Sequence, residues 1–187
     1  RSRFDLQDSK DQPCFNISKP ETPVVDAKWL ASIYPLYHLA MSTGDLYRVA
    51  VDLLQKDPKD VRLSTVYSDA CIKWYRYDNG TSFLKGFNGL TREFARTPLK
   101  DNPDGFTFMG VGGDQDVSTG TLYVTLTDNK TFLFTAVCMK NGGMTWGVGS
   151  PTPTLTEETK KVVLDHAMSL GFNREDFIEL KYDTCKN

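Results

Sequence analysis

The sequence predicts an all-β fold: an eight-stranded antiparallel up-and-down barrel, with a C-terminal helix and a helical insertion between the first two strands. Between residues 62 and 150, short segments rich in aromatic and β-branched residues alternate with Gly, Asn, Asp and Pro at intervals typical of a sandwich or barrel. With 187 residues the chain is about one domain long. Eight strands close a barrel that side chains fill or that encloses one small ligand.

We expect a single domain over residues 1–187, divided in chain order. Residues 1–25 are polar, carry three prolines and show no periodicity, which indicates an extended N-terminal arm. The barrel is expected over 26–150, the C-terminal helix over 153–171 and a short tail over 177–187.

The first barrel strand is predicted at 29–34, where an aromatic and β-branched segment ends at Pro35. A different periodicity follows, with apolar residues at helical spacing, and predicts a helix over about 44–56 that ends before Pro58. Its apolar stripe is Leu46, Val49, Ala50, Leu53 and Leu54. The spacing leaves two placements open: the helix covers the barrel mouth, or it packs outside the barrel.

Seven further strands are predicted between turn-forming residues. They are 70–77, 83–90, 92–97, 106–111, 121–127, 131–140 and 144–149. After them, Thr154-x-x-Glu157 has the pattern of a capping box at a helix start, and Gly171 supplies the left-handed position at its end.

The composition excludes two classes of partner. There are 22 basic and 24 acidic residues, so the formal net charge of −2 offers no field for nucleic acid or anionic lipid. Apolar stretches are too short for a transmembrane segment. Aromatic residues make up 12% of the chain, which suits either a β core or a ligand cavity.

The four cysteines, Cys14, Cys71, Cys138 and Cys185, form no CxxC pair, and no histidine is near them in sequence. This spacing favours two disulfides over a metal site, and four cysteines allow three pairings. Three sequons, at Asn16, Asn79 and Asn129, are candidate glycosylation sites on turns. We therefore expect a secreted, extracellular glycoprotein.

Two segments carry a resemblance to a known family. Asp26–Pro35 is similar to the G-x-W-Y-x-x-A-x-Y-P signature of the lipocalins, with Ala27 in place of glycine, and Val124–Phe132 is similar to their T-D-Y-x-x-Y turn. The order of strands, helix and cysteines resembles the extracellular branch of insect bilin-binding proteins and apolipoprotein D. The family's last-strand arginine is missing, because Gly147–Ser150 occupies that place. The resemblance implies the disulfides Cys14–Cys138 and Cys71–Cys185.

The pleat of the strands predicts which residues face the barrel interior. If Cys71 and Cys138 point outward, Trp74, Leu133 and Thr135 point inward. Aromatic and apolar residues that share a face on other strands extend this set, and tyrosines near the first strand are expected at the entrance. The candidate ligand-binding residues are Tyr34, Tyr37, Trp74, Phe83, Lys85, Phe87, Phe106, Phe108, Leu122, Val124, Leu133, Thr135 and Trp146. A cavity of about 300–1,000 Å³ is expected, and a solid aromatic core is the alternative.

We therefore predict a secreted carrier of a small hydrophobic ligand, and the resemblance suggests a pigment, a bilin or a carotenoid. Sequestration of amines or lipid mediators, and an extracellular interaction protein with a solid core, are the alternatives. No catalytic residue, catalytic cofactor or metal site is predicted, because neither His38 nor His166 lies beside a nucleophile in the sequence. Whether the chain forms a homo-oligomer is left open.

Overall fold

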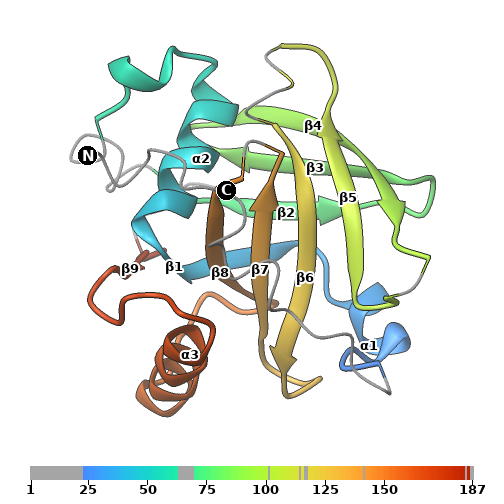
Figure 1. Cartoon of the computed structure of the whole chain (residues 1–187), viewed down its shortest axis with the longest axis vertical. Coiled ribbons are helices and arrows are strands. Elements are labelled where there is room, and N and C mark those ends of the chain that lie inside the picture. Colours follow the sequence, from blue (N-terminus) through green and yellow to red (C-terminus); the bar gives the residue numbers. More distant parts are fainter. Residues whose placement is uncertain are drawn as a thin grey trace.

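Eight antiparallel strands wrap into a closed barrel in the computed structural model (Figure 1), which describes residues 23–62, 70–100, 102–113, 115, 118–140, 142–183 and 185. The strands are β1 (Leu36–Met41), β2 (Lys73–Arg76), β3 (Thr81–Gly86), β4 (Leu90–Pro98), β5 (Gly105–Gly110), β6 (Thr119–Thr127), β7 (Leu133–Met139) and β8 (Met144–Ser150). Each strand pairs with the next from β2 to β8, and β1 pairs with β8. Two pairs between β1 and β2, Leu36 with Trp74 and Tyr37 with Lys73, close the circle. The predicted fold class is confirmed.

The first barrel strand does not lie where the sequence predicted it. Residues 29–34 fall in and just after a short helix, α1 (Ala27–Ser32), and the strand follows at Leu36–Met41. The helix begins because the Asp26 carboxylate accepts hydrogen bonds from the backbone N–H groups of Lys28 and Trp29, at 2.9 and 3.3 Å. Side chains of α1 then pack across the end of the barrel, so tertiary burial outweighs the strand preference of the aromatic segment.

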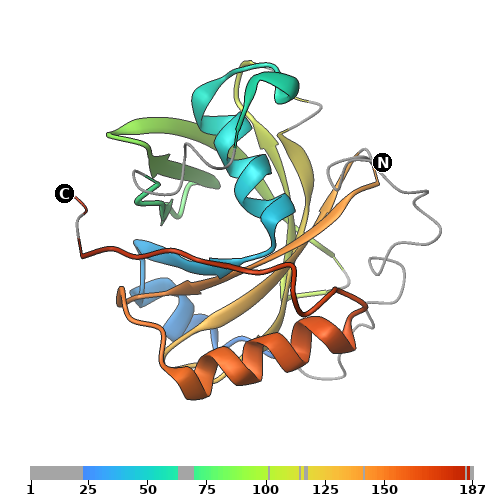
Figure 2. The ribbon, with the colours of Figure 1, turned by 90° about the vertical axis from the view of Figure 1, so that its left-hand side faces the viewer.

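The predicted helix between the first two strands is confirmed as α2 (Thr43–Leu54), and it lies in the mouth of the barrel rather than outside it (Figure 2). Its apolar side chains belong to the same buried cluster as Ile72, Leu84, Phe94 and Phe108, which point inward from four positions of the barrel wall. Leu46, Val49 and Ala50 have no exposed surface. A short 3₁₀ helix, Pro58–Asp60, follows α2.

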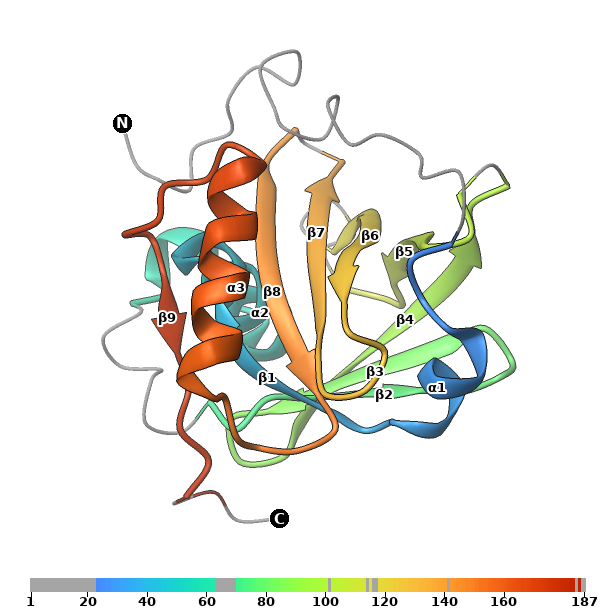
Figure 3. The same ribbon diagram turned by 90° about the horizontal axis from the view of Figure 1, so that it is seen from below.

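The C-terminal helix α3 (Glu157–Ser169) covers the outer face of β7 and β8 (Figure 3). The helix begins two residues later than the predicted capping box at Thr154 implies. Its N-cap is Thr156, whose hydroxyl accepts a hydrogen bond from the backbone N–H of Thr159 at 3.1 Å. Gly171 has a φ of +97°, as predicted for the helix end. Among the described residues, no helix is long and apolar enough to cross a membrane.

The C-terminal segment crosses the junction between β1 and β2. A short strand, β9 (Ile178–Glu179), pairs with β1, and the Tyr182 hydroxyl donates hydrogen bonds to the carbonyl oxygens of His38 and Ile72, at 2.5 and 2.8 Å. The expected disulfide between Cys71 and Cys185 is present, with a sequence separation of 114. Cys138 is also disulfide-bonded, and its expected partner Cys14 lies outside the described residues.

The candidate glycosylation sites differ in their surroundings. Asn79 is exposed in the turn between β2 and β3. Asn129 is half-buried, and its amide accepts a hydrogen bond from Asp26 N and donates one to the Val24 carbonyl, at 2.8 and 3.0 Å. Asn16 lies outside the described residues.

Candidate functional site

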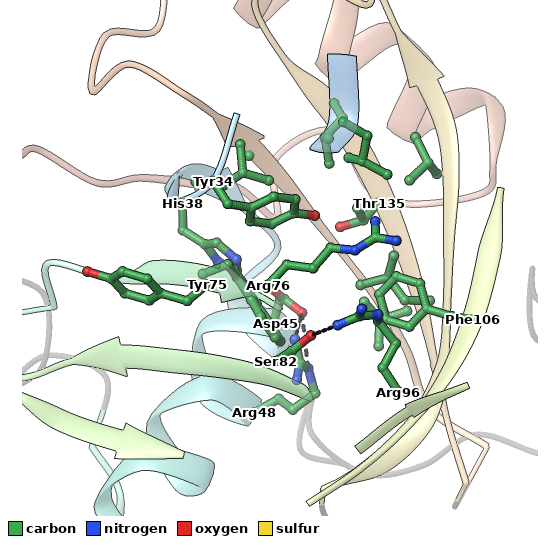
Figure 4. A pocket seen from close by; sticks show the side chains of 18 residues that line it. Tyr34, His38, Asp45, Arg48, Tyr75, Arg76, Ser82, Arg96, Phe106 and Thr135 are labelled. Carbon is green, nitrogen blue, oxygen red and sulfur yellow. Dashed lines mark hydrogen bonds and ion pairs between the residues drawn. The ribbon is translucent and has the colours of Figure 1, made fainter. Parts of the chain in front are cut away.

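An internal cavity lies between α1 at one end of the barrel and α2 at the other (Figure 4). Its volume is about 60 Å³, which on a scale of roughly 10–15 Å³ per water is room for about four to six water molecules. It is smaller than predicted from the strand count because the side chains of α2 fill the rest of the barrel interior. The lumen is therefore neither fully hollow nor fully packed.

Seven of the predicted ligand-binding residues line this cavity. They are Tyr34, Trp74, Phe106, Leu122, Val124, Leu133 and Thr135. Leu133 and Thr135 alternate on β7 as the outward position of Cys138 implied, and Trp74 faces inward from β2. Leu36 and Val137 complete an apolar wall. An outward-facing Cys138 also predicts the inward position of Val137, whereas Leu36 lies outside the strand predicted at 29–34.

Two predicted residues on β3 point away from the cavity. Trp74 is paired with Leu84, so Leu84 shares its inward face, and Phe83 and Lys85 take the outward face. Phe83 packs edge-to-face against Tyr77, and Lys85 is exposed. The expectation that they contact a ligand inside the barrel is wrong, because they lie one position out of register with the inward set.

The predicted inward position of Trp146 is also wrong. Its neighbour on β8, Gly147, pairs with the inward-facing Thr135, so Trp146 faces out. It stacks between Phe134 and Phe177 beneath α3, with ring centroids 5.3 and 6.3 Å away. This aromatic residue belongs to the core between helix and barrel.

Tyr37, Phe87 and Phe108 are buried or half-buried but do not line the cavity. Tyr37 lies outside the barrel against Tyr182, with ring centroids 5.2 Å apart. Phe87 follows the end of β3 and packs in the cluster around α2, and Phe108 points inward at the level that α2 occupies. For Phe108 the predicted face is correct, but the helix takes the place of a ligand.

The sequence analysis missed every charged residue of the cavity wall. Asp45 and Arg48 come from α2, Arg76 from β2 and Arg96 from β4. The alternation itself contained the signal, because Arg76 follows Trp74 on β2 and Arg96 follows the inward-facing Phe94 on β4, each by two positions.

At the end of the cavity formed by α2, the charges are paired with one another. Arg48 Nη2 lies 2.9 Å from Asp45 Oδ1, and Thr145 donates a hydrogen bond to the same oxygen at 2.7 Å. Asp52, one helical turn further on, lies 3.5 Å from Arg48 Nη1 and accepts a hydrogen bond from the Ser118 hydroxyl at 2.5 Å. Burial raises the pKa of Asp52 to about 6 although Arg48 opposes this. These contacts attach α2 to β6 and β8 inside the barrel.

His38 contributes a buried polar group to the cavity wall. Its exposed fraction is 8%, and within the described part of the chain its Nδ1 atom has no hydrogen-bond partner. Burial lowers its pKa to about 4, against opposition from Asp45, so the ring is neutral at pH 7.

At the end formed by α1, two half-buried arginines and a tyrosine meet (Figure 4). Arg96 donates hydrogen bonds to the Thr81 carbonyl, the Ser82 hydroxyl and the Tyr77 carbonyl, at 2.9, 2.8 and 2.7 Å, which fixes its guanidinium in place. Burial raises the pKa of the Tyr34 phenol, while Arg76 and Arg96 lower it. In the described ranges, no carboxylate lies within ion-pair distance of either arginine.

The chemistry of the wall is that of a binding site. Within the residues that the structure describes, no three His, Cys, Asp or Glu side chains are grouped to hold a metal ion. The cavity combines an apolar wall with a few fixed polar groups, which is the usual composition of a small-molecule pocket.

Comparison with known proteins adds evidence at the level of the fold. No protein-family profile matches the sequence, and no curated protein matches it significantly. Lobster apocrustacyanin A1 superposes with a TM-score of 0.52 at 13% identity, over 82% of each chain. The chain has the lipocalin fold.

Two further neighbours with this fold were solved with small molecules. The possum milk whey lipocalin trichosurin, with bound 4-ethylphenol, matches at 13% identity and a TM-score of 0.50, over 78% of this chain and 93% of its own. LTBP1 in complex with leukotriene C4 matches at 14% identity and a TM-score of 0.52, over 83% of this chain and 86% of its own.

Proposed function

We propose that the protein is a secreted, non-catalytic carrier that binds a small hydrophobic molecule inside its barrel. The main observation in support is the closed barrel with an internal cavity whose wall is apolar on β5, β6 and β7. Structural neighbours that hold 4-ethylphenol and leukotriene C4 support the same use of the fold. The Cys71–Cys185 disulfide supports an oxidising, extracellular compartment.

Thermal unfolding with a panel of small apolar compounds tests this function. A compound that binds only the native state raises the melting temperature in proportion to the logarithm of its concentration above Kd. We expect compounds of up to about six non-hydrogen atoms to do so in the wild-type protein, and Leu133→Trp, which fills the cavity from β7, to abolish the shift. A panel without any concentration-dependent shift would contradict the carrier function.

From the lipocalin signatures in the sequence we propose two more specific points. The ligand is a pigment, and the protein belongs to the branch of bilin-binding proteins and apolipoprotein D. A bilin or a carotenoid is far larger than a cavity of about 60 Å³, so this ligand requires α2 to leave the barrel mouth. An absorption spectrum of protein purified from its natural source tests the idea. A visible band that travels with the protein is expected, and a colourless protein with a different bound molecule would contradict it.

A further inference from the structure

We propose that the cavity selects a small amphipathic anion, an organic carboxylate whose charged group is bound between Arg76 and Arg96 and whose apolar body lies against β5, β6 and β7. This inference rests on the proposed carrier function and names the class of ligand. Sequestration of amines, one of the alternatives from the sequence, receives no support from this wall.

The charge on the cavity wall favours an anionic ligand. Three guanidinium groups and one carboxylate line it. The carboxylate, Asp45, is already bound by Arg48 and Thr145. Arg48 lies between Asp45 and Asp52, so the end formed by α2 has no excess positive charge. The excess positive charge is at the other end, on Arg76 and Arg96.

The two arginines at this end repel each other. Burial lowers the pKa of Arg96, and the positive charge of Arg76 lowers it further. The exposed Asp78 offsets this only in part. Two like charges in a half-buried site cost free energy that an anion between them would recover, and guanidinium groups bind carboxylates through paired hydrogen bonds. The Tyr34 hydroxyl lies beside them and can donate a further hydrogen bond.

The size and polarity of the remaining wall suit a short apolar group. Phe106 lies beside Arg96 in Figure 4, and Leu122, Val124 and Leu133 line the same cavity. The cavity volume of about 60 Å³ gives room for about six non-hydrogen atoms, the size of a carboxylate with a short alkyl chain. The site therefore suits a ligand with one charged end and a short apolar body.

Calorimetric titration with butanoate, 1-butanol and butylamine tests the proposal, because the three ligands share one short alkyl chain and differ in charge. We expect butanoate to bind at least about tenfold more tightly than butanol, as a charge-assisted hydrogen bond predicts, and butylamine to bind least. Arg76→Gln should reduce the preference for butanoate over butanol to within about threefold. Lys85→Gln is the matched control, because it removes an exposed cation from the outer face of the neighbouring strand.

Salt provides a second measurement on the unmodified protein, independent of whether the variant folds. The affinity for butanoate should fall as the NaCl concentration rises, and the affinity for butanol should not. Equal binding of butanoate and butanol, unchanged in Arg76→Gln, would overturn the anion site and leave the carrier function intact. If none of the three ligands binds, both proposals fail, and tighter binding of butylamine would overturn the anion site alone.

Discussion

Individual buried residues determine what the interior of this barrel can accept. His38 is a neutral imidazole whose Nδ1 atom has no hydrogen-bond partner in the described part of the chain, while Asp45 and Arg48 neutralise each other. A polar group that is buried without a partner lowers stability, and at a ligand site it also offers a hydrogen bond to a guest.

Burial of His38 should make the protein less stable in mild acid. Its native pKa of about 4 lies below its ordinary value of 6.5, so between these values the unfolded state binds the proton and the native state does not. The free energy of unfolding should therefore fall as the pH drops, with His38 accounting for about 2 kcal/mol between pH 7 and pH 5. Urea unfolding of His38→Gln should show a loss smaller by that amount.

Asp52 acts in the opposite direction, because its raised pKa stabilises the native state as the pH falls through about 6. It is present in both proteins, so the difference between wild type and His38→Gln isolates the histidine. An identical pH dependence in the two proteins would contradict the buried neutral state of His38.

The two tryptophans of the barrel strands should report differently on a ligand. Trp74 lines the cavity, whereas Trp146 stacks beneath α3 on the far side of the wall. Titration with butanol should change the intrinsic fluorescence of wild type and of Trp146→Phe, and Trp74→Phe should lose most of the change. A response that depends on Trp146 would place the ligand outside the barrel.

At the scale of elements, α2 is a helix that the barrel needs as part of its core. Leu46 is fully buried against the inward residues of the wall. Leu46→Ala should lower the free energy of unfolding by about 2–5 kcal/mol, because it removes buried apolar contacts and leaves a void. Val162→Ala on α3, where the side chain is 44% exposed, should change stability by less than about 0.5 kcal/mol. Equal small effects of both variants would show that α2 is not packed in the barrel.

The disulfide between Cys71 and Cys185 fastens the C-terminal segment over the junction of β1 and β2. A bridge with a sequence separation of 114 residues restricts the unfolded chain strongly. The double variant Cys71→Ser, Cys185→Ser should lose about 4–5 kcal/mol of unfolding free energy. Tyr182→Phe, which removes only the hydrogen bonds to His38 and Ile72, should lose about 1–2 kcal/mol by the same measurement.

Most of the barrel could be predicted from the sequence, but the position of its first strand and the orientation of several side chains could not. Turn residues and alternation place seven of the eight strands, and the outward position of Cys138 correctly orients β7. The same alternation was applied on the wrong face of β3 and β8, because register depends on pairing between strands and a shift of one residue reverses the side chains.

Two other failures have different causes. The segment at 29–34 has strand-forming residues, and only the Asp26 cap and burial at the barrel end make part of it helical. The cavity arginines were overlooked because charged residues are usually exposed, and their partners and cavity become visible only in three dimensions.

The size of the cavity sets a prediction for the molecule as a whole. In a series of straight-chain carboxylates, affinity should rise by up to about 0.8 kcal/mol per added CH₂ until the chain fills the cavity, and then stop rising. Val137→Ala removes volume from a residue that touches both the cavity and the α2 cluster, so the break should move to a longer chain. A steady increase through the longest soluble acid would show that α2 yields to the ligand.

Because α2 belongs to the same chain as the barrel, it behaves as a tethered competitor for the lumen. Its effective concentration is fixed by the short connection to β1 and does not fall on dilution. A bulky ligand would have to displace α2 from the lumen at every protein concentration. A ligand that fits in the cavity that α2 leaves free would not. The protein thus selects ligands by size, because its own helix occupies the part of the lumen that a larger ligand would need.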